Sequence, residues 1–206
     1  MISEEWIREA NTSWKDADPG VLIQQGLELA IRPVVTTNFR PYEAAILHAC
    51  VTVQPEIPVL WCDTGYNTAA TYKHAEYLID RLQLCVHPYV PQRSRAHREA
   101  LSAIPELDTP EHQLFTHEVK LEPFRRAMAE HKPDVWFTNL RQGQTALRDS
   151  LGIFSLSGDG VLKVSPFYYW SDRQMDDYLK THALPNEFDY HDPTKGLAHR
   201  ECGLHL

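Results

Sequence analysis

The sequence lacks the features that mark a membrane-bound or secreted protein. No apolar run in its 206 residues reaches the length of a membrane-spanning helix. Its beginning, MISEEWIREA, is acidic and amphipathic, whereas a signal peptide has a basic start followed by an apolar core. These two absences predict a cytoplasmic protein that does not associate with a membrane.

Cysteine is scarce, and its spacing excludes the common metal-binding motifs. None of the four cysteines belongs to a CC or CxxC pair, so the close spacing typical of zinc or iron–sulfur sites is absent. We therefore expect no bound metal and no cluster. Cys50, Cys62 and Cys85 lie in apolar stretches and are expected to pack as small core residues. Cys202 alone has polar neighbours.

Positive charge is also in deficit, with 20 Lys and Arg against 28 Asp and Glu and a net charge of −8. This balance argues against nucleic-acid binding through a broad basic face. A local positive pocket could still bind a small anion. The chain also lacks internal repeats, low-complexity segments and linkers, and 43% of its residues are apolar. Such a composition is typical of one soluble globular domain.

Strand and helix patterns alternate along the chain. The pattern of buried strands occurs at 33–37, 57–62, 85–90 and 135–138, and helical spacing at 3–11, 21–30, 42–53, 67–82 and 121–128. This alternation predicts an α/β fold with an open, mostly parallel sheet and helices on both faces. A hairpin is expected over 153–164, and Ser171 with Gln174 forms a capping box for a further helix.

Two stretches have little periodicity. Residues 91–118 are interpreted as an irregular lid, or as a solvated surface excursion. Residues 184–206 are interpreted as a mobile C-terminal arm, which leaves 1–183 as a single α/β nucleotide-binding domain.

Polar residues follow three of the predicted strands, where parallel sheets bind their ligands. Thr36-Thr37-Asn38-Phe39 leads into a helix opened by Pro41, and a helix N-terminus attracts anions. Asp63-Thr64-Gly65 follows the second strand and serves either as a ligand site or as a helix-capping turn. Two arginines and a glutamine suited to phosphate or sulfate follow the fourth strand, unless they form an ordinary charged loop: Arg141, Gln144 and Arg148.

The last residues surround Cys202 with groups that favour a thiolate. Arg200 supplies a cation and His205 an imidazole, and the thiolate is the nucleophilic form of cysteine. One interpretation is an accidental cysteine in a frayed chain end. The other is a tethered nucleophile that reaches a substrate held elsewhere, with His205 tuning its pKa or donating a proton.

Taken together, these stretches resemble the phosphoadenosine phosphosulfate (PAPS) reductases, from about residue 20 to the end. Glu201–His205 is similar to the catalytic C-terminal motif of the family, and residues 36–39 to its modified phosphate-binding loop. The DTGY turn, the VKLEP stretch and the LKV stretch followed by a proline and a tryptophan also match. The resemblance implies an adenine nucleotide alpha hydrolase-like fold with catalytic Cys202 and His205. It also implies substrate binding by Thr36, Thr37, Asn38, Phe39, Asp63, Thr64, Gly65, Lys120, Arg141, Gln144, Arg148, Lys163 and Trp170.

The resemblance implies a chemistry as well. Cys202 would attack the sulfuryl group of PAPS, and thioredoxin or glutaredoxin would then release sulfite from the S-sulfocysteine, as a step of assimilatory sulfate reduction. The related adenylyl-sulfate (APS) reductases carry extra cysteine pairs for a four-iron cluster. Their absence here implies the cluster-free, PAPS-using branch. Relatives are commonly homodimers, so a homodimer is expected.

Some residues depart from the family pattern. Arg40 replaces the loop glycine, Gln142 and Gly143 replace the usual Arg-Glu, and the stretch from Tyr190 to Cys202 is short. Three alternatives stay open: APS reduction without a cluster, an ATP pyrophosphatase-type adenylating enzyme, and a nucleotide-binding module without activity. The pyrophosphatase loop, Ser-Gly-Gly-x-Asp-Ser, is absent here.

Overall fold

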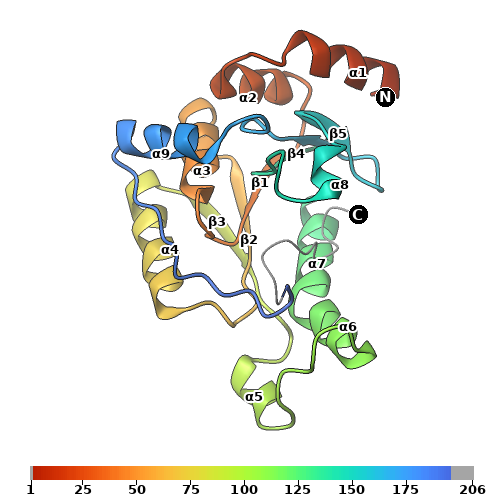
Figure 1. The fold of residues 1–206 in the computed structure, drawn as a ribbon, viewed down its shortest axis with the longest axis vertical. Coiled ribbons are helices and arrows are strands. Elements are labelled where there is room, and N and C mark those ends of the chain that lie inside the picture. Colours follow the sequence, from red (N-terminus) through yellow and green to blue (C-terminus); the bar gives the residue numbers. More distant parts are fainter. Residues whose placement is uncertain (1, 196–206) are drawn as a thin grey trace.

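The computed structural model describes residues 2–195, which fold around a six-stranded sheet (Figure 1). The strand order is β3-β2-β1-β4-β6-β5, and every neighbouring pair is parallel except β5 with β6. The strands are β1 (Pro33–Thr37), β2 (Pro58–Cys62), β3 (Cys85–Tyr89), β4 (Val135–Phe137), β5 (Phe154–Leu156) and β6 (Leu162–Val164). The predicted α/β fold, its mostly parallel sheet and the hairpin are confirmed.

Helices cover both faces of this sheet and make three layers (Figure 1). One face carries α2 (Pro19–Glu28), α3 (Glu43–Val53), α4 (Ala69–Leu82) and α9 (Asp172–Thr181), and the other carries α7 (Glu122–His131). The remaining helices are α1 (Glu4–Ser13), α5 (Arg95–Glu99), α6 (Pro110–Thr116), α8 (Ala146–Asp149) and the π-helical turn η1 (His117–Leu121). None of these described helices is both long and apolar enough to cross a membrane.

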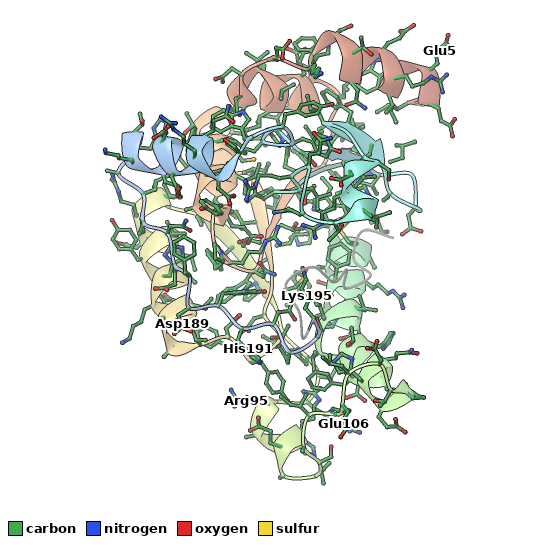
Figure 2. All side chains as sticks on the ribbon, viewed as in Figure 1. Glu5, Arg95, Glu106, Asp189, His191 and Lys195 are labelled. Atoms are coloured by element: carbon green, nitrogen blue, oxygen red, sulfur yellow. The ribbon has the colours of Figure 1, made fainter. Side chains whose placement is uncertain are left out.

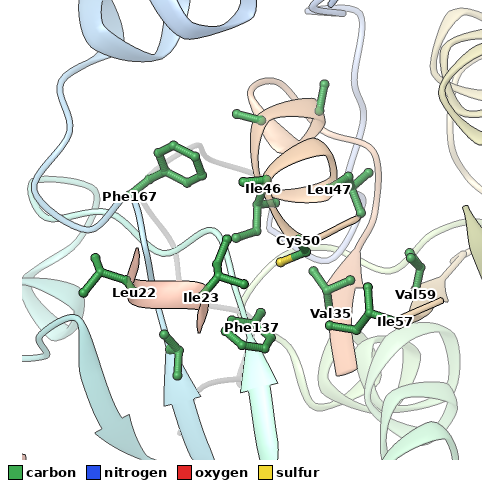
Figure 3. Packing of buried hydrophobic residues seen from close by; sticks show 14 of the residues in the cluster. Leu22, Ile23, Val35, Ile46, Leu47, Cys50, Ile57, Val59, Phe137 and Phe167 are labelled. Carbon is green, nitrogen blue, oxygen red and sulfur yellow. The ribbon is translucent and has the colours of Figure 1, made fainter. Parts of the chain in front are cut away.

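The core lies against both faces of the central strands. Figure 3 shows Val35 of β1 packed with Ile46 and Cys50 of α3 on one face. Val34 of the same strand belongs to the cluster on the opposite face. A strand buried on both faces has no polar side, which explains why two consecutive valines, Val34 and Val35, stand in β1 instead of an alternation of apolar and polar residues.

We predicted that residues 91–118 would be irregular. This prediction is wrong in part, because the segment contains α5 and α6. Each of these short helices begins at a hydroxyl cap. The Ser94 Oγ accepts from the backbone N–H of His97 at 3.2 Å, and the Thr109 Oγ1 accepts from that of His112 at 3.1 Å. Helices this short leave too few turns for an apolar period to show in the sequence. Local capping, rather than an amphipathic stripe, marks their start.

Cys85 is exposed, which corrects the prediction that it packs in the core. It opens β3, the edge strand of the sheet, where the side chain has no neighbouring strand on its outer side. Its sulfur lies 3.6 Å from Nε2 of His87. Cys50 and Cys62 are buried as predicted.

The opposite edge of the sheet, β5, is covered by the N-terminal helix. The Asn11 side chain donates to the carbonyl oxygen of Phe154 at 2.8 Å and accepts from the backbone N–H of the same residue at 2.9 Å. The ring of Trp6 packs edge-on against that of Phe154, with 5.5 Å between centroids. One amide side chain of α1 thus takes both backbone bonds that a further strand would make with Phe154.

Candidate functional site

Two adjoining cavities open at the carboxyl ends of β1 and β4. The first, here the β1 cavity, has a volume of about 60 Å³ and is lined by residues that include Thr36, Thr37, Asn38, Lys120 and Thr138. The second, here the Arg141 cavity, measures about 430 Å³ and is lined by residues that include Tyr42, Arg141, Gln144 and Trp170. Three cationic residues line both: Arg40, Arg148 and Lys195. The shared wall is therefore suited to an anion that spans the two cavities.

The loop after β1 is organised by a carboxylate of the chain itself. Glu43, buried at the first position of α3, accepts from the Thr37 hydroxyl at 2.7 Å and from the Asn38 N–H at 2.8 Å. Its other oxygen accepts from Arg40 Nε at 2.9 Å. Phe39 and Tyr42 have left-handed φ values of 52° and 69°, which turn the loop around this carboxylate. Donors that we expected to face an anionic ligand are thus bound to Glu43.

Glu43→Gln is expected to lower the melting temperature by roughly 4–8 °C. Hydrogen bonds to a buried charge contribute about 2 kcal/mol to stability. In a chain of this size, a loss of 1 kcal/mol lowers the melting temperature by about 2–4 °C. The amide turns an N–H₂ group toward donors that need an acceptor. Thermal unfolding followed by circular dichroism measures the change, with exposed Glu56→Gln as the control. An unchanged melting temperature for Glu43→Gln would contradict this account of the loop.

The Asp63-Thr64-Gly65 turn after β2 is stabilised from within. The Asp63 Oδ1 accepts from the Gly65 N–H at 2.8 Å and from the Tyr72 hydroxyl at 3.0 Å. Gly65 has a φ of 79°, a conformation that a side chain would strain. The cap of α4 is not in this turn but at Thr68, whose hydroxyl accepts from the N–H of Thr71. These hydrogen bonds give Asp63 a structural role, since its carboxylate holds the turn in shape.

The segment after β4 places two buried arginines beside each other. Gln144 Oε1 accepts from Nη1 of Arg148 and, at 3.3 Å, from the backbone N–H of Arg141. Arg141 also donates to the carbonyl of Trp170 at 3.2 Å and pairs with Asp172 at 2.7 Å. The Nε of Arg141 is buried with no partner in the described structure. The side chains of this segment are therefore fixed before any ligand arrives.

The structure brings most of the sequence-predicted residues to the cavities, but not all of them. The β1 cavity gathers Thr36, Thr37, Asn38, Lys120 and Arg148, and the Arg141 cavity gathers Arg141, Gln144, Arg148 and Trp170. Five residues lie outside both linings: Phe39, Asp63, Thr64, Gly65 and Lys163. Burial lowers the pKa of Lys163, whose side chain is enclosed in the middle of β6. Cys202 and His205 lie outside the described residues.

Three site residues were missed as contributors. Arg40 was noted only as a departure from glycine, yet it lines both cavities and donates to the carbonyl of Asn139 at 3.2 Å. Glu43 could have been found as an acidic residue in the first turn of the helix predicted over 42–53. That helix begins at Glu43, so Pro41 precedes the cap residue Tyr42 and does not open the helix, contrary to the prediction from the sequence. Lys195 follows an Asp-Pro turn and carries no local sign of its position.

The described part of the chain contains neither a metal centre nor a reactive cysteine at the cavities. In residues 2–195, no group of three or more His, Cys, Asp or Glu side chains is arranged to hold a metal ion. Cys62 lines the β1 cavity, but burial raises the pKa of its thiol to about 12, against an opposing effect of Lys120. The thiol of Cys62 is therefore protonated at neutral pH and unsuited to nucleophilic attack.

The sequence is similar to those of known proteins. Residues 32–188 match the family described as the phosphoadenosine phosphosulfate reductase domain. A phosphoadenosine 5'-phosphosulfate reductase of Synechocystis sp. is 33% identical over 198 residues, which cover 84% of this chain and 79% of that protein. One from Synechococcus sp. is 32% identical and covers 97% of each chain.

Solved structures share the fold. The PAPS reductase of Candida auris, determined as a phosphate complex, superimposes with a TM-score of 0.79 at 21% identity and covers 90% of each chain. The FMN adenylyltransferase of Candida glabrata gives a TM-score of 0.55 at 10% identity, over 87% of this chain and 58% of that one. The adenine nucleotide alpha hydrolase-like fold is thereby confirmed. Because the family match covers most of the chain and the relatives extend over nearly all of it, this chain belongs to the phosphoadenosine phosphosulfate reductase family of oxidoreductases.

Proposed function

We propose that this chain reduces PAPS to sulfite and adenosine 3',5'-bisphosphate, with Cys202 as its nucleophile. One observation carries the proposal. Residues 184–195, here called the strap, run from the end of α9 along the carboxyl edge of the sheet, and Lys195 lines both cavities (Figure 2). Cys202 follows seven residues later, and an extended chain of that length reaches about 24 Å. The strap thus brings the nucleophile within range of the cationic wall.

The reaction needs a thiolate and a held anion. The Cys202 sulfur attacks the sulfur of the sulfuryl group, a sulfur–sulfur bond forms, and the bond to the bridging phosphate oxygen breaks. Adenosine 3',5'-bisphosphate leaves with the electron pair of that bond. Arg200 and His205 favour the thiolate form of Cys202. Arg148 and Arg40 offset the charge of the nucleotide, and Gln144 keeps Arg148 in place.

A second thiol then attacks the Cys202 sulfur and releases sulfite, which leaves a mixed disulfide. This thiol comes from outside the chain. Cys50 and Cys62 are buried with raised pKa values, and Cys85 opens β3 at the amino ends of the strands, far along the sheet from the cavities. A small dithiol protein such as thioredoxin or glutaredoxin is the expected donor. From the family resemblance, we propose that the reaction serves assimilatory sulfate reduction.

The test is the intact mass of the reduced protein after mixing with PAPS, and separately with APS, without a thiol donor. We expect one added sulfuryl group on Cys202 with PAPS and none with APS. An adduct with APS would overturn the choice of substrate and keep the chemistry. No adduct with either nucleotide, under conditions where the nucleotide binds, would overturn the covalent scheme.

A further inference from the structure

The strap is attached to the helical layers of the domain at several points. The Asn186 side chain accepts from the N–H of Tyr42 at 2.8 Å. The carbonyl oxygen of Asp189 accepts from the hydroxyls of Thr68 and Thr71 at 2.7 and 2.8 Å. In Figure 2, Asp189, His191 and Lys195 follow one another along this path. The Pro193 carbonyl oxygen lies 3.1 Å from Nε2 of His112. One further attachment lies directly beside the cavities and is ionic.

That attachment is the pair formed by Lys120 and Asp192. Lys120 Nζ donates to Asp192 Oδ2, and each side chain is only 4% exposed. The other carboxylate oxygen accepts from the N–H of Thr194 at 3.0 Å and from its hydroxyl at 2.6 Å. Lys120 lies in η1, a π-helical turn of the kind found at functional sites. Both oxygens of Asp192 are thereby held.

A buried pair of this kind is costly to break. Removing one partner leaves the other charge buried without compensation, whereas the intact pair is tolerated. Burial by itself raises the pKa of Asp192, but the charge of Lys120 and the hydrogen bonds from Lys120 and Thr194 hold it below its ordinary range. The carboxylate is therefore ionised at neutral pH. The pair fixes the main chain of the strap three residues before Lys195.

We infer that Lys120 and Asp192 are positioning residues, which fix the root of the C-terminal segment at the cavities and act on the reaction through Cys202. The inference rests on the proposed function. Sequence resemblance alone implies that Lys120 binds substrate. Here its ammonium is held by a carboxylate of its own chain, ten residues before Cys202, while its side chain forms a wall of the β1 cavity. One ion pair thus joins the substrate cavity to the segment that carries the nucleophile.

Steady-state kinetics separate the two roles of Lys120. With Asp192→Asn we expect kcat to fall roughly tenfold, since small displacements of reacting groups cost one to two orders of magnitude. KM for PAPS should stay within about twofold. Lys120→Met should act alike, and the double variant should be no slower than either single one, because both remove the same link. Asp189→Asn is the matched control, because the contact of Asp189 with α4 uses the backbone carbonyl.

A direct substrate role for Lys120 predicts another pattern. Lys120→Met would then raise KM for PAPS, Asp192→Asn would leave kcat unchanged, and the two effects would add. That pattern would overturn the inference. If Asp192→Asn fails to fold, Thr194→Val removes a hydroxyl that donates to Asp192 and adds no charge. It should lower kcat in the same direction by a smaller factor, and an unchanged kcat would count against the pair.

Hydrogen exchange gives a readout besides activity. Amides of the strap should exchange faster in Asp192→Asn than in the parent chain, while those of β1 and β4 stay protected. If the strap amides of folded Asp192→Asn exchange at the parent rate while the parent enzyme is active on PAPS, the positioning role is overturned and the proposed function stands. A parent chain inactive on PAPS would overturn the proposed function and the catalytic part of the inference, even where the variant loosens the strap.

Discussion

Cys202→Ser is expected to abolish sulfite formation from PAPS, with a loss of at least roughly 1,000-fold in kcat, the scale seen when a covalent nucleophile is removed. A serine hydroxyl is protonated at neutral pH, and its oxygen cannot form the sulfur–sulfur bond that a second thiol later attacks. Nucleotide binding should survive, because the residues that line the cavities, among them Arg40, Lys120 and Arg148, are unchanged in this variant. Sulfite release and nucleotide affinity, measured on the same preparation, give both results.

Cys85→Ser is the matched control for this change. Cys85 is the exposed cysteine among those described, and it lies on the edge strand away from both cavities. Its variant should turn over normally and should still gain the sulfuryl group in the mass measurement. A normal rate in Cys202→Ser would show that the nucleophile lies elsewhere.

Arg148→Ala is expected to raise KM for PAPS about 100-fold, because truncating one partner of a buried charge pair costs about 3 kcal/mol. Arg148 is 3% exposed and lines both cavities, so its charge acts in a site with little water. Its link to Gln144 fixes the guanidinium before substrate binds. The Tyr168 hydroxyl donates to the backbone carbonyl of Arg148 at 2.6 Å. This hydrogen bond does not use the Arg148 side chain, so it remains possible in the variant.

Two further variants test whether charge or shape is at work. Arg148→Lys keeps the charge and loses the planar fork, so it should recover only part of the affinity. Exposed Arg173→Ala on α9 removes the same charge from a surface position and should leave KM unchanged. A normal KM in folded Arg148→Ala would remove Arg148 from the binding site.

Local patterns explain which parts of the fold were predictable. The bounds of β1 were predicted without error, because proline begins the strand and the tight turn at Asn38 ends it. The capping box was also predicted, since Ser171 and Gln174 make their reciprocal bonds within one turn of α9. In both cases the partners are a few residues apart, so sequence spacing alone specifies the contact.

Long-range pairing explains most of what was missed. Lys120 and Asp192 are 72 residues apart, and no local sequence pattern predicts that the strap contacts η1. The exposure of Cys85 depends on the place of β3 in the strand order, which apolar character does not reveal. The burial of Lys163 is similar: a lysine in a short strand normally faces solvent, and only the position of β6 between β4 and β5 encloses it.

The cover over β5 protects one edge of the sheet from pairing with other chains. An uncovered edge strand offers free backbone donors and acceptors to other chains and promotes aggregation. Here Asn11 binds both backbone groups of Phe154, and Gly152 leaves it room, since a Cβ there would lie 2.6 Å from the amide nitrogen. The family match begins at residue 32, after α1 and α2. A chain that began at residue 32 would lack this cover and would expose the backbone groups of β5.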